Sequence, residues 1–215
     1  MNYTALIVAA GSGSRMGLGY NKMLYTLANH QTMIEKTVSI FEQDERCKQI
    51  IVVTSAQEME TFVKLLDVSK VCFARGGSTR QESVFQGLKA VMCDYVFIHD
   101  GARPWLDLAC LDRLCECVQK TKACLLTVPV KDTIKVVEDG IVKHTPERAM
   151  LYAAQTPQAF ETNAIFEANI KAIKDHVCVT DDASIMEACG KYQVHSVMGS
   201  YENTKVTTIE DIKGK

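Results

Sequence analysis

The chain has 215 residues, of which 47% are hydrophobic and 23% are charged. These fractions are typical of a globular protein and exclude a chain that is disordered throughout. The formal net charge of −2 argues against a protein that coats nucleic acid, because such proteins carry a basic surplus. No apolar run has the roughly 18–20 residues that a membrane span needs, and the first residues lack the basic region of a signal peptide. We expect one cytoplasmic domain of residues 1–215 that binds neither nucleic acid nor a membrane.

Strand-like and helix-like segments alternate along most of the chain. Short apolar runs bounded by glycine or polar residues indicate buried strands, and apolar residues spaced at i, i+3, i+4 and i+7 indicate helices. The predicted strands are residues 4–10, 49–54, 71–74, 95–99, 123–128 and 193–198. The predicted helices are residues 32–42, 57–66, 81–92, 162–174 and 182–188, with another that starts near Leu108. This alternation predicts a doubly wound α/β fold with a mostly parallel, twisted sheet.

A segment at about residues 131–156 interrupts the alternation. Residues 132–137 and 141–145 flank the sequence Glu138-Asp139-Gly140. An Asp-Gly step between two such runs predicts a β-hairpin. We interpret the segment as a protruding β-arm, which reaches a neighbouring subunit or covers a site.

The nine cysteines do not form a recognisable disulfide framework. Cys115 and Cys117 are separated by one residue, but no second Cys/His pair lies at zinc-finger spacing. Leu111, Leu114 and Cys115 follow the spacing of one buried helix face. Free cysteine behaves as a small apolar residue, so we expect structural thiols.

The strongest local signal is the run from Ala9 to Gly17, AAGSGSRMG, which is followed by Asn21-Lys22. Backbone N–H groups in a glycine-rich loop after a strand can bind phosphate oxygens. A P-loop would need Gly-Lys-Ser/Thr, and a dinucleotide loop would need glycine where Met16 stands and an acid near Thr54. Both known loops therefore fit poorly. Two interpretations of the run remain open, a different kind of phosphate-binding loop and a tight turn with scattered charges.

Two further stretches stand where ligands commonly bind. His99-Asp100-Gly101-Ala102-Arg103-Pro104 follows a predicted strand, and ligands of α/β sheets bind beyond the carboxyl ends of strands. Asp100 then faces a ligand, a hydroxyl or a metal ion, or alternatively caps the helix near Leu108. In the turn that starts at Gly76-Gly77, Ser78 or Thr79 either caps the next helix or contacts a ligand. The later polar residues, taken singly, are typical of helix caps and solvated strand ends.

Together these stretches resemble one known family, the 2-C-methyl-D-erythritol 4-phosphate cytidylyltransferases. The similarity lies in AAGSGSRMG with NK, GGSTRQESV, HDGARP, VPVKDTIK, AAQTPQAF, VTDDAS and NTKVT, in the family's order from residue 4 to about 211. The resemblance implies a Rossmann-like nucleotidyltransferase fold. It also implies transfer of CMP from CTP to 2-C-methyl-D-erythritol 4-phosphate, a sugar-alcohol phosphate, with release of pyrophosphate and with Mg²⁺ as cofactor.

The resemblance also implies roles for individual residues. Arg15 and Lys22 stabilise the transition state, and Arg148 and Lys205 position the acceptor phosphate. The implied nucleotide-binding residues are Ala9, Ala10, Gly11, Ser12, Gly13, Gly77 and Ser83. The implied acceptor-binding residues are Asp100, Arg103, Thr133, Thr156 and Thr180. Mg²⁺ is expected mainly on the CTP phosphates, with Asp100 as the candidate protein ligand.

In the family the arm crosses to a second subunit, so the resemblance implies a homodimer in which Thr133 and Arg148 serve the partner's site. The chain departs from the family at Ser78, where aspartate is common beside the cytosine, and at Asn21, where proline is common. Ribitol-5-phosphate cytidylyltransferase remains an alternative, as does a nucleotide-binding module without turnover. A dinucleotide-dependent oxidoreductase is disfavoured by the failed loop pattern.

Overall fold

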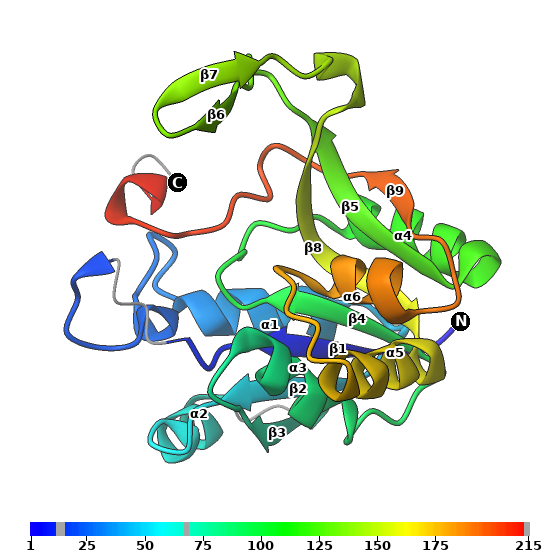
Figure 1. Ribbon diagram of the computed structural model, residues 1–215. Helices are drawn as coiled ribbons and strands as arrows, with labels where there is room; N and C mark the ends of the chain where they lie inside the picture. The colour runs from blue at the N-terminus through cyan, green and yellow to red at the C-terminus, as the bar shows by residue number, and fades with distance from the viewer. Residues whose placement is uncertain (12–15, 67–68, 213–215) are drawn as a thin grey trace.

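The computed structural model describes residues 1–11, 16–66 and 69–212, which build a seven-stranded sheet flanked by helices (Figure 1). The strand order is β3-β2-β1-β4-β8-β5-β9. All neighbouring pairs are parallel except those of β8, which runs antiparallel to β4 and β5. The strands are β1 (Tyr3–Val8), β2 (Cys47–Thr54), β3 (Val71–Arg75), β4 (Tyr95–Asp100), β5 (Ala123–Pro129), β8 (Tyr152–Glu161) and β9 (His195–Met198). The predicted mostly parallel α/β fold is confirmed.

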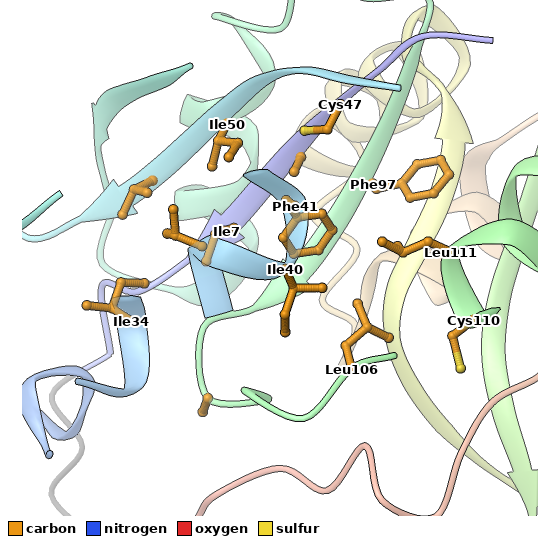
Figure 2. Packing of buried hydrophobic residues seen from close by; sticks show 14 of the residues in the cluster. Ile7, Ile34, Ile40, Phe41, Cys47, Ile50, Phe97, Leu106, Cys110 and Leu111 are labelled. Carbon is orange, nitrogen blue, oxygen red and sulfur yellow. The ribbon is translucent and has the colours of Figure 1, made fainter. Parts of the chain in front are cut away.

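Helices cover both faces of the sheet because successive strand residues point to opposite sides. Ile7 belongs to a buried cluster with residues of α1 and α4, whereas Leu6 packs with residues of α3, α5 and α6. Figure 2 shows the first cluster, in which Phe41 of α1 and Leu111 of α4 lie over the strands. The helices are α1 (Met33–Gln43), α2 (Met59–Leu65), α3 (Arg80–Leu88), α4 (Leu108–Thr121), α5 (Thr162–Lys174) and α6 (Asp182–Cys189), with short 3₁₀ turns η2 (Lys22–Leu24), η3 (Arg148–Met150) and η4 (Ile209–Ile212). No described helix combines the length and apolar character needed to cross a membrane.

Side-chain caps explain where several helices begin. Thr32 and Glu35 form a reciprocal capping box at the start of α1. Asp107 caps α4, and Asp181 caps α6. The alternative in which Asp100 caps the helix near Leu108 is therefore wrong, because Asp107 occupies that position.

The longest strand, β8, was not among the predicted elements. It contains Pro157, which has no N–H to donate and is usually excluded from inner strands. Its residues 155–160 are buried without alternation, and its polar side chains Gln155, Thr156 and Gln158 lie among them. Neither the period nor the composition of β8 is that of a typical strand.

The predicted hairpin is confirmed as a separate two-stranded sheet of β6 (Val136–Glu138) and β7 (Ile141–His144). It stands apart from the main sheet, at the top of Figure 1. Asp139 and Gly140 have φ values of 52° and 76°, the pair of positive angles that a type I′ turn requires. The strands are shorter than predicted, and their side chains are exposed.

The nine cysteines are free thiols. Cys47 and Cys115 are buried, and burial raises the pKa of each to about 11. These two thiols therefore stay protonated at neutral pH and pack as apolar groups.

Candidate active site

Two adjoining cavities open at the carboxyl ends of the central strands. The larger, of about 510 Å³, follows β1, and the smaller, of about 230 Å³, lies between β4, β8 and the start of α6. Arg80, Asp100 and Lys205 line both cavities. The chain passes from β1 to β2 on one side and places β4 on the other, so this is the switch point at which α/β sheets bind ligands.

The larger cavity brings together most of the predicted nucleotide-binding residues. Its lining includes Ala9, Ala10, Gly11, Gly77 and Ser83, with the predicted catalytic residues Lys22 and Lys205. Ser12, Gly13 and Arg15 lie outside the described residues. The structure thus gathers residues from four separate parts of the sequence around one cavity.

The turn before α3 has little room for side chains. A Cβ added to Gly76 would lie 2.7 Å from Ala10 Cβ and 2.9 Å from Ser83 Oγ. The Ser83 hydroxyl accepts from Gly77 N–H at 3.1 Å and donates to the Thr79 carbonyl at 2.8 Å. Ser83 therefore holds the turn against the end of the first strand and keeps backbone at the cavity wall.

Both alternatives for Ser78 and Thr79 can now be assigned. Thr79 caps α3 by accepting from Glu82 N–H at 3.0 Å. Ser78 donates its N–H and its hydroxyl to Glu82 Oε2, at 2.7 and 2.6 Å, and it lines the larger cavity. The Ser78 hydroxyl is thus bonded to a carboxylate one helical turn later.

Lys22 enters the larger cavity from η2. Its ammonium donates to the Val206 carbonyl at 2.7 Å, and the residue is only 9% exposed. Asn21 caps η2 and donates to Glu58 Oε2 at 2.7 Å and to the Ala9 carbonyl at 3.3 Å. The amide of Asn21 therefore connects the end of the first strand to the residue before α2, a contact that proline could not make.

Asp100 is the electrostatic centre of the two cavities. Lys205 Nζ lies 2.7 Å from Oδ2, Arg80 Nε lies 3.3 Å from Oδ1, and Arg103 Nε lies 3.9 Å from Oδ2. Burial alone would raise the pKa of the Asp100 carboxyl, but Arg80, Lys205 and Arg103 together hold it well below its usual range. Asp100 is an anion at every physiological pH.

A chain of hydrogen bonds fixes the backbone beside Asp100. His99 is fully buried, and burial lowers its pKa to about 4, so the ring is neutral at pH 7. Its Nε2 lies 3.1 Å from the Arg103 carbonyl, which can only accept, so Nε2 carries the proton. Nδ1 then accepts from the Thr156 hydroxyl at 3.0 Å, and the Thr156 oxygen accepts from Asp100 N–H at 3.0 Å. Thr156 lines the smaller cavity, and its hydroxyl proton is already donated to His99.

Residues 199–207 cross the ends of the strands, from the Thr127 carbonyl of β5 at Gly199 to the loop after β4 at Val206, and bring Lys205 to the site. The side-chain amide of buried Asn203 donates to the Thr156 carbonyl at 2.9 Å, and the main-chain carbonyl of Asn203 accepts from Arg103 Nη1 at 2.7 Å. Val206 N–H donates to the Ala102 carbonyl at 2.8 Å. These bonds hold Lys205 and Arg103 close to Asp100.

The start of α6 forms the far side of the smaller cavity, where the predicted residue Thr180 lies. Gln158 of β8 donates to Asp181 Oδ2 at 2.8 Å and accepts from Ala183 N–H at 2.8 Å. Asp181 in turn caps Ser184 N–H at 3.0 Å. Asp181, and not the adjacent Thr180, is therefore the residue that caps α6.

Arg80 and Asp182 are not among the residues that the sequence motifs predicted for the site. Arg80 Nη2 lies 2.8 Å from Asp182 Oδ2, and the Asp182 side chain has no exposed surface. Burial raises the pKa of Asp182, and Arg80 opposes that rise. A signal was present in the sequence, because Arg80 directly follows the cap of α3, where the helix dipole disfavours a cation.

Thr133 and Arg148 lie on the arm and line neither cavity. Both side chains are exposed, and Arg148 Nη1 donates to the Lys131 carbonyl at 3.2 Å. The structure therefore brings together the other described candidate residues but not these two.

The comparisons with known proteins agree on one family. The family model described as 2-C-methyl-D-erythritol 4-phosphate cytidylyltransferase matches residues 3–214. The enzyme of that name from Halalkalibacterium halodurans is 45% identical, with 99% of this chain and 94% of the relative covered, and the one from Clostridioides difficile is 42% identical, with 98% and 90% covered. A crystal structure of 4-diphosphocytidyl-2C-methyl-D-erythritol synthase from Anaerococcus prevotii matches with a TM-score of 0.87 and 30% identity, over 98% of this chain and 94% of the other.

Proposed function

This chain belongs to the family of 2-C-methyl-D-erythritol 4-phosphate cytidylyltransferases, and from that membership we propose its reaction. The enzyme transfers CMP from CTP to 2-C-methyl-D-erythritol 4-phosphate and releases pyrophosphate. The product is 4-diphosphocytidyl-2-C-methyl-D-erythritol, an intermediate of isoprenoid precursor synthesis. The observation that carries the proposal is the pair of adjoining cavities that share Arg80, Asp100 and Lys205, because a transfer reaction needs two substrates side by side.

The chemistry explains why cations line the site. An oxygen of the acceptor phosphate attacks the α-phosphorus of CTP, a new P–O bond forms, and the bond to the β-phosphate breaks with its electrons leaving on pyrophosphate. Both reactants are anions, so their approach is repulsive unless positive charge lies between them. In our proposal Lys22 and Arg15 stabilise the charge of the transition state and of pyrophosphate. Lys205 holds the acceptor phosphate, and Asp100 accepts from an acceptor hydroxyl.

The donor set of the larger cavity fits a magnesium ion carried by the nucleotide. Asp100 is the single acidic side chain among its described lining residues, and no described group of three or more His, Cys, Asp or Glu could hold a metal alone. Mg²⁺ commonly binds through one or two carboxylates and substrate phosphates. The triphosphate oxygens would hold most of the ion's coordination sites and have their charge neutralised by it, and Asp100 would contribute at most one carboxylate oxygen.

We further propose that two chains form a homodimer through the arm. Val137, Ile141 and Val142 are each more than half exposed on the hairpin, and Met150 is 76% exposed. An apolar surface of this kind favours burial against a partner. In such a dimer Thr133 and Arg148 would reach the acceptor cavity of the other subunit.

The decisive test is pyrophosphate release with Mg²⁺ and each nucleoside triphosphate, with 2-C-methyl-D-erythritol 4-phosphate and ribitol 5-phosphate offered in parallel. We expect release only with CTP and the methylerythritol phosphate. Turnover of ribitol 5-phosphate instead would leave the reaction type intact and refute the acceptor. Binding of CTP without release for either acceptor would favour a module without turnover.

A further inference from the structure

Arg80 stands where a cation does not stabilise its own helix. It is the first residue of α3, directly after the capping residue Thr79. Helix N-termini carry partial positive charge, which repels a basic side chain. Arg80 is therefore held by its contacts across the site.

Those contacts join two carboxylates from different elements. The guanidinium lies 2.8 Å from Asp182 Oδ2 through Nη2 and 3.3 Å from Asp100 Oδ1 through Nε. Asp182 is fully buried, its Oδ1 makes no hydrogen bond, and Arg80 is its only ion-pair partner among the described residues. A buried carboxylate of this kind needs its cation nearby, so Asp182 anchors the Arg80 side chain.

The second contact determines how Asp100 is oriented. Lys205 and Arg103 both approach Oδ2, at 2.7 and 3.9 Å, whereas Arg80 approaches Oδ1. Each oxygen therefore has its own cation, which fixes the rotation of the carboxylate. Without Arg80 the group would be held at Oδ2 alone, and Oδ1 would lose its charged partner.

We propose that Arg80 is a positioning residue for the transfer reaction. Anchored on Asp182, it orients the Asp100 carboxylate toward the acceptor. This carboxylate lies at the boundary between the two cavities, both of which are lined by Arg80, Asp100 and Lys205. The inference rests on the proposed function, because it concerns the acceptor of that reaction. Arg80 acts through Asp100, so its loss affects the acceptor more than the nucleotide.

The test compares Arg80→Gln and Arg80→Lys with wild type and with Arg46→Gln as a matched control. Arg46 also pairs with two aspartates, Asp44 and Asp112, and its side chain is 32% exposed against 28% for Arg80, but it lines neither cavity. At saturating CTP, we expect Arg80→Gln to lower kcat/KM for the acceptor at least tenfold. The Kd of CTP with Mg²⁺, measured by calorimetry, should change less than threefold. Arg80→Lys should recover part of the loss, because it keeps the charge but cannot span both carboxylates.

The double variant Arg80→Gln/Asp182→Asn separates positioning from stability. Arg80→Gln alone leaves Asp182 without its cation and should lower the melting temperature, and the second change should restore much of it. The acceptor kcat/KM should stay low in the double variant, because Asp100 still lacks its orienting partner. A merely structural role predicts that melting temperature and activity recover together.

Three outcomes would overturn the proposal. They are an acceptor kcat/KM within threefold of wild type in folded Arg80→Gln, an equal loss in Arg46→Gln, and recovery of activity in the double variant. If wild type itself turns over no acceptor, the proposed function fails and this inference with it. An active wild type with an unaffected Arg80→Gln refutes the role of Arg80 alone.

Discussion

Lys22 is a charged residue that the fold has nearly removed from solvent. Its ammonium is aimed into the larger cavity and is held on the Val206 carbonyl. A cation placed before the reaction needs no reorganisation as charge develops. We therefore predict that Lys22→Ala lowers kcat roughly 10²–10³-fold, as for the loss of one preorganised electrostatic group.

Steady-state pyrophosphate release checks this prediction. Lys70→Ala is the matched control, since Lys70 Nζ also donates to a backbone carbonyl, that of Glu42 at 3.1 Å, and it lines neither cavity. The control should keep kcat within a factor of about two of wild type, a much smaller change than the loss of one preorganised group produces. A loss of less than threefold in Lys22→Ala would contradict its assigned role.

His99 makes stability depend on pH. Its folded-state pKa is lowered from 6.5 to about 4 by burial, so below pH 6.5 the unfolded chain binds a proton that the folded chain does not. Stability is therefore lost as the pH falls from 6.5 to 4, and between pH 7 and pH 5 the loss should be about 2 kcal/mol.

Urea unfolding at pH 7 and pH 5 measures that loss. His99→Gln should lower stability at both pH values but abolish most of the difference between them. His195→Gln, a change at an exposed histidine, should keep the difference. An unchanged pH difference in His99→Gln would show that other groups are responsible.

For individual residues, the sequence predicted which ones line the cavity but not the ion pair that supports them. The family resemblance led to Lys22, Asp100, Lys205 and the backbone of Ala9 and Gly77, which all line the larger cavity. The pair of Arg80 and Asp182 is separated by 102 positions, and no local pattern links such distant residues. Only the folded sheet brings the first residue of α3 to the first residue of α6.

Among the elements, α1 offers a clear test of local stabilisation. Thr32 and Glu35 satisfy each other's backbone donors at its start, with Thr32 N–H donating to Glu35 Oε2 at 2.7 Å. Thr32→Ala should destabilise the protein by about 1 kcal/mol and lower the melting temperature by roughly 2–4 °C for a chain of this size. Calorimetry measures the shift, and Thr32→Ser, which keeps the hydroxyl, should remain close to wild type. Equal effects of alanine and serine would contradict the capping explanation.

Elements with one regular period were predictable, and those governed by tertiary contacts were not. The helix predicted at residues 162–174 has the same bounds in α5, and the Asp-Gly step located the hairpin turn. By contrast, β8 contains Pro157 and three buried polar side chains, and it is a strand because β4 and β5 supply its pairing on both sides. Such pairing leaves no local trace in sequence.

For the whole molecule, the proposed dimer would build each site from two chains. If Arg148 serves the partner subunit, a dimer of one Arg148→Ala chain and one Lys22→Ala chain contains one intact site. Mixing the two inactive variants should then restore part of the wild-type activity. Differently tagged chains purified as a verified heterodimer allow the measurement. No activity in that heterodimer would place both residues in the same subunit's site.

The central place of β8 has a consequence for the order in which the chain assembles. During synthesis β5 emerges while its two sheet neighbours, β8 and β9, are still unmade. Until residue 161 is available to pair with Tyr95, one edge of β4 and both edges of β5 stay open, and open edges promote association between chains. Pairing over such sequence distances is slow. A nascent chain halted before the arm is complete should therefore be a substrate for chaperones, whereas one released after β9 has every strand of the sheet.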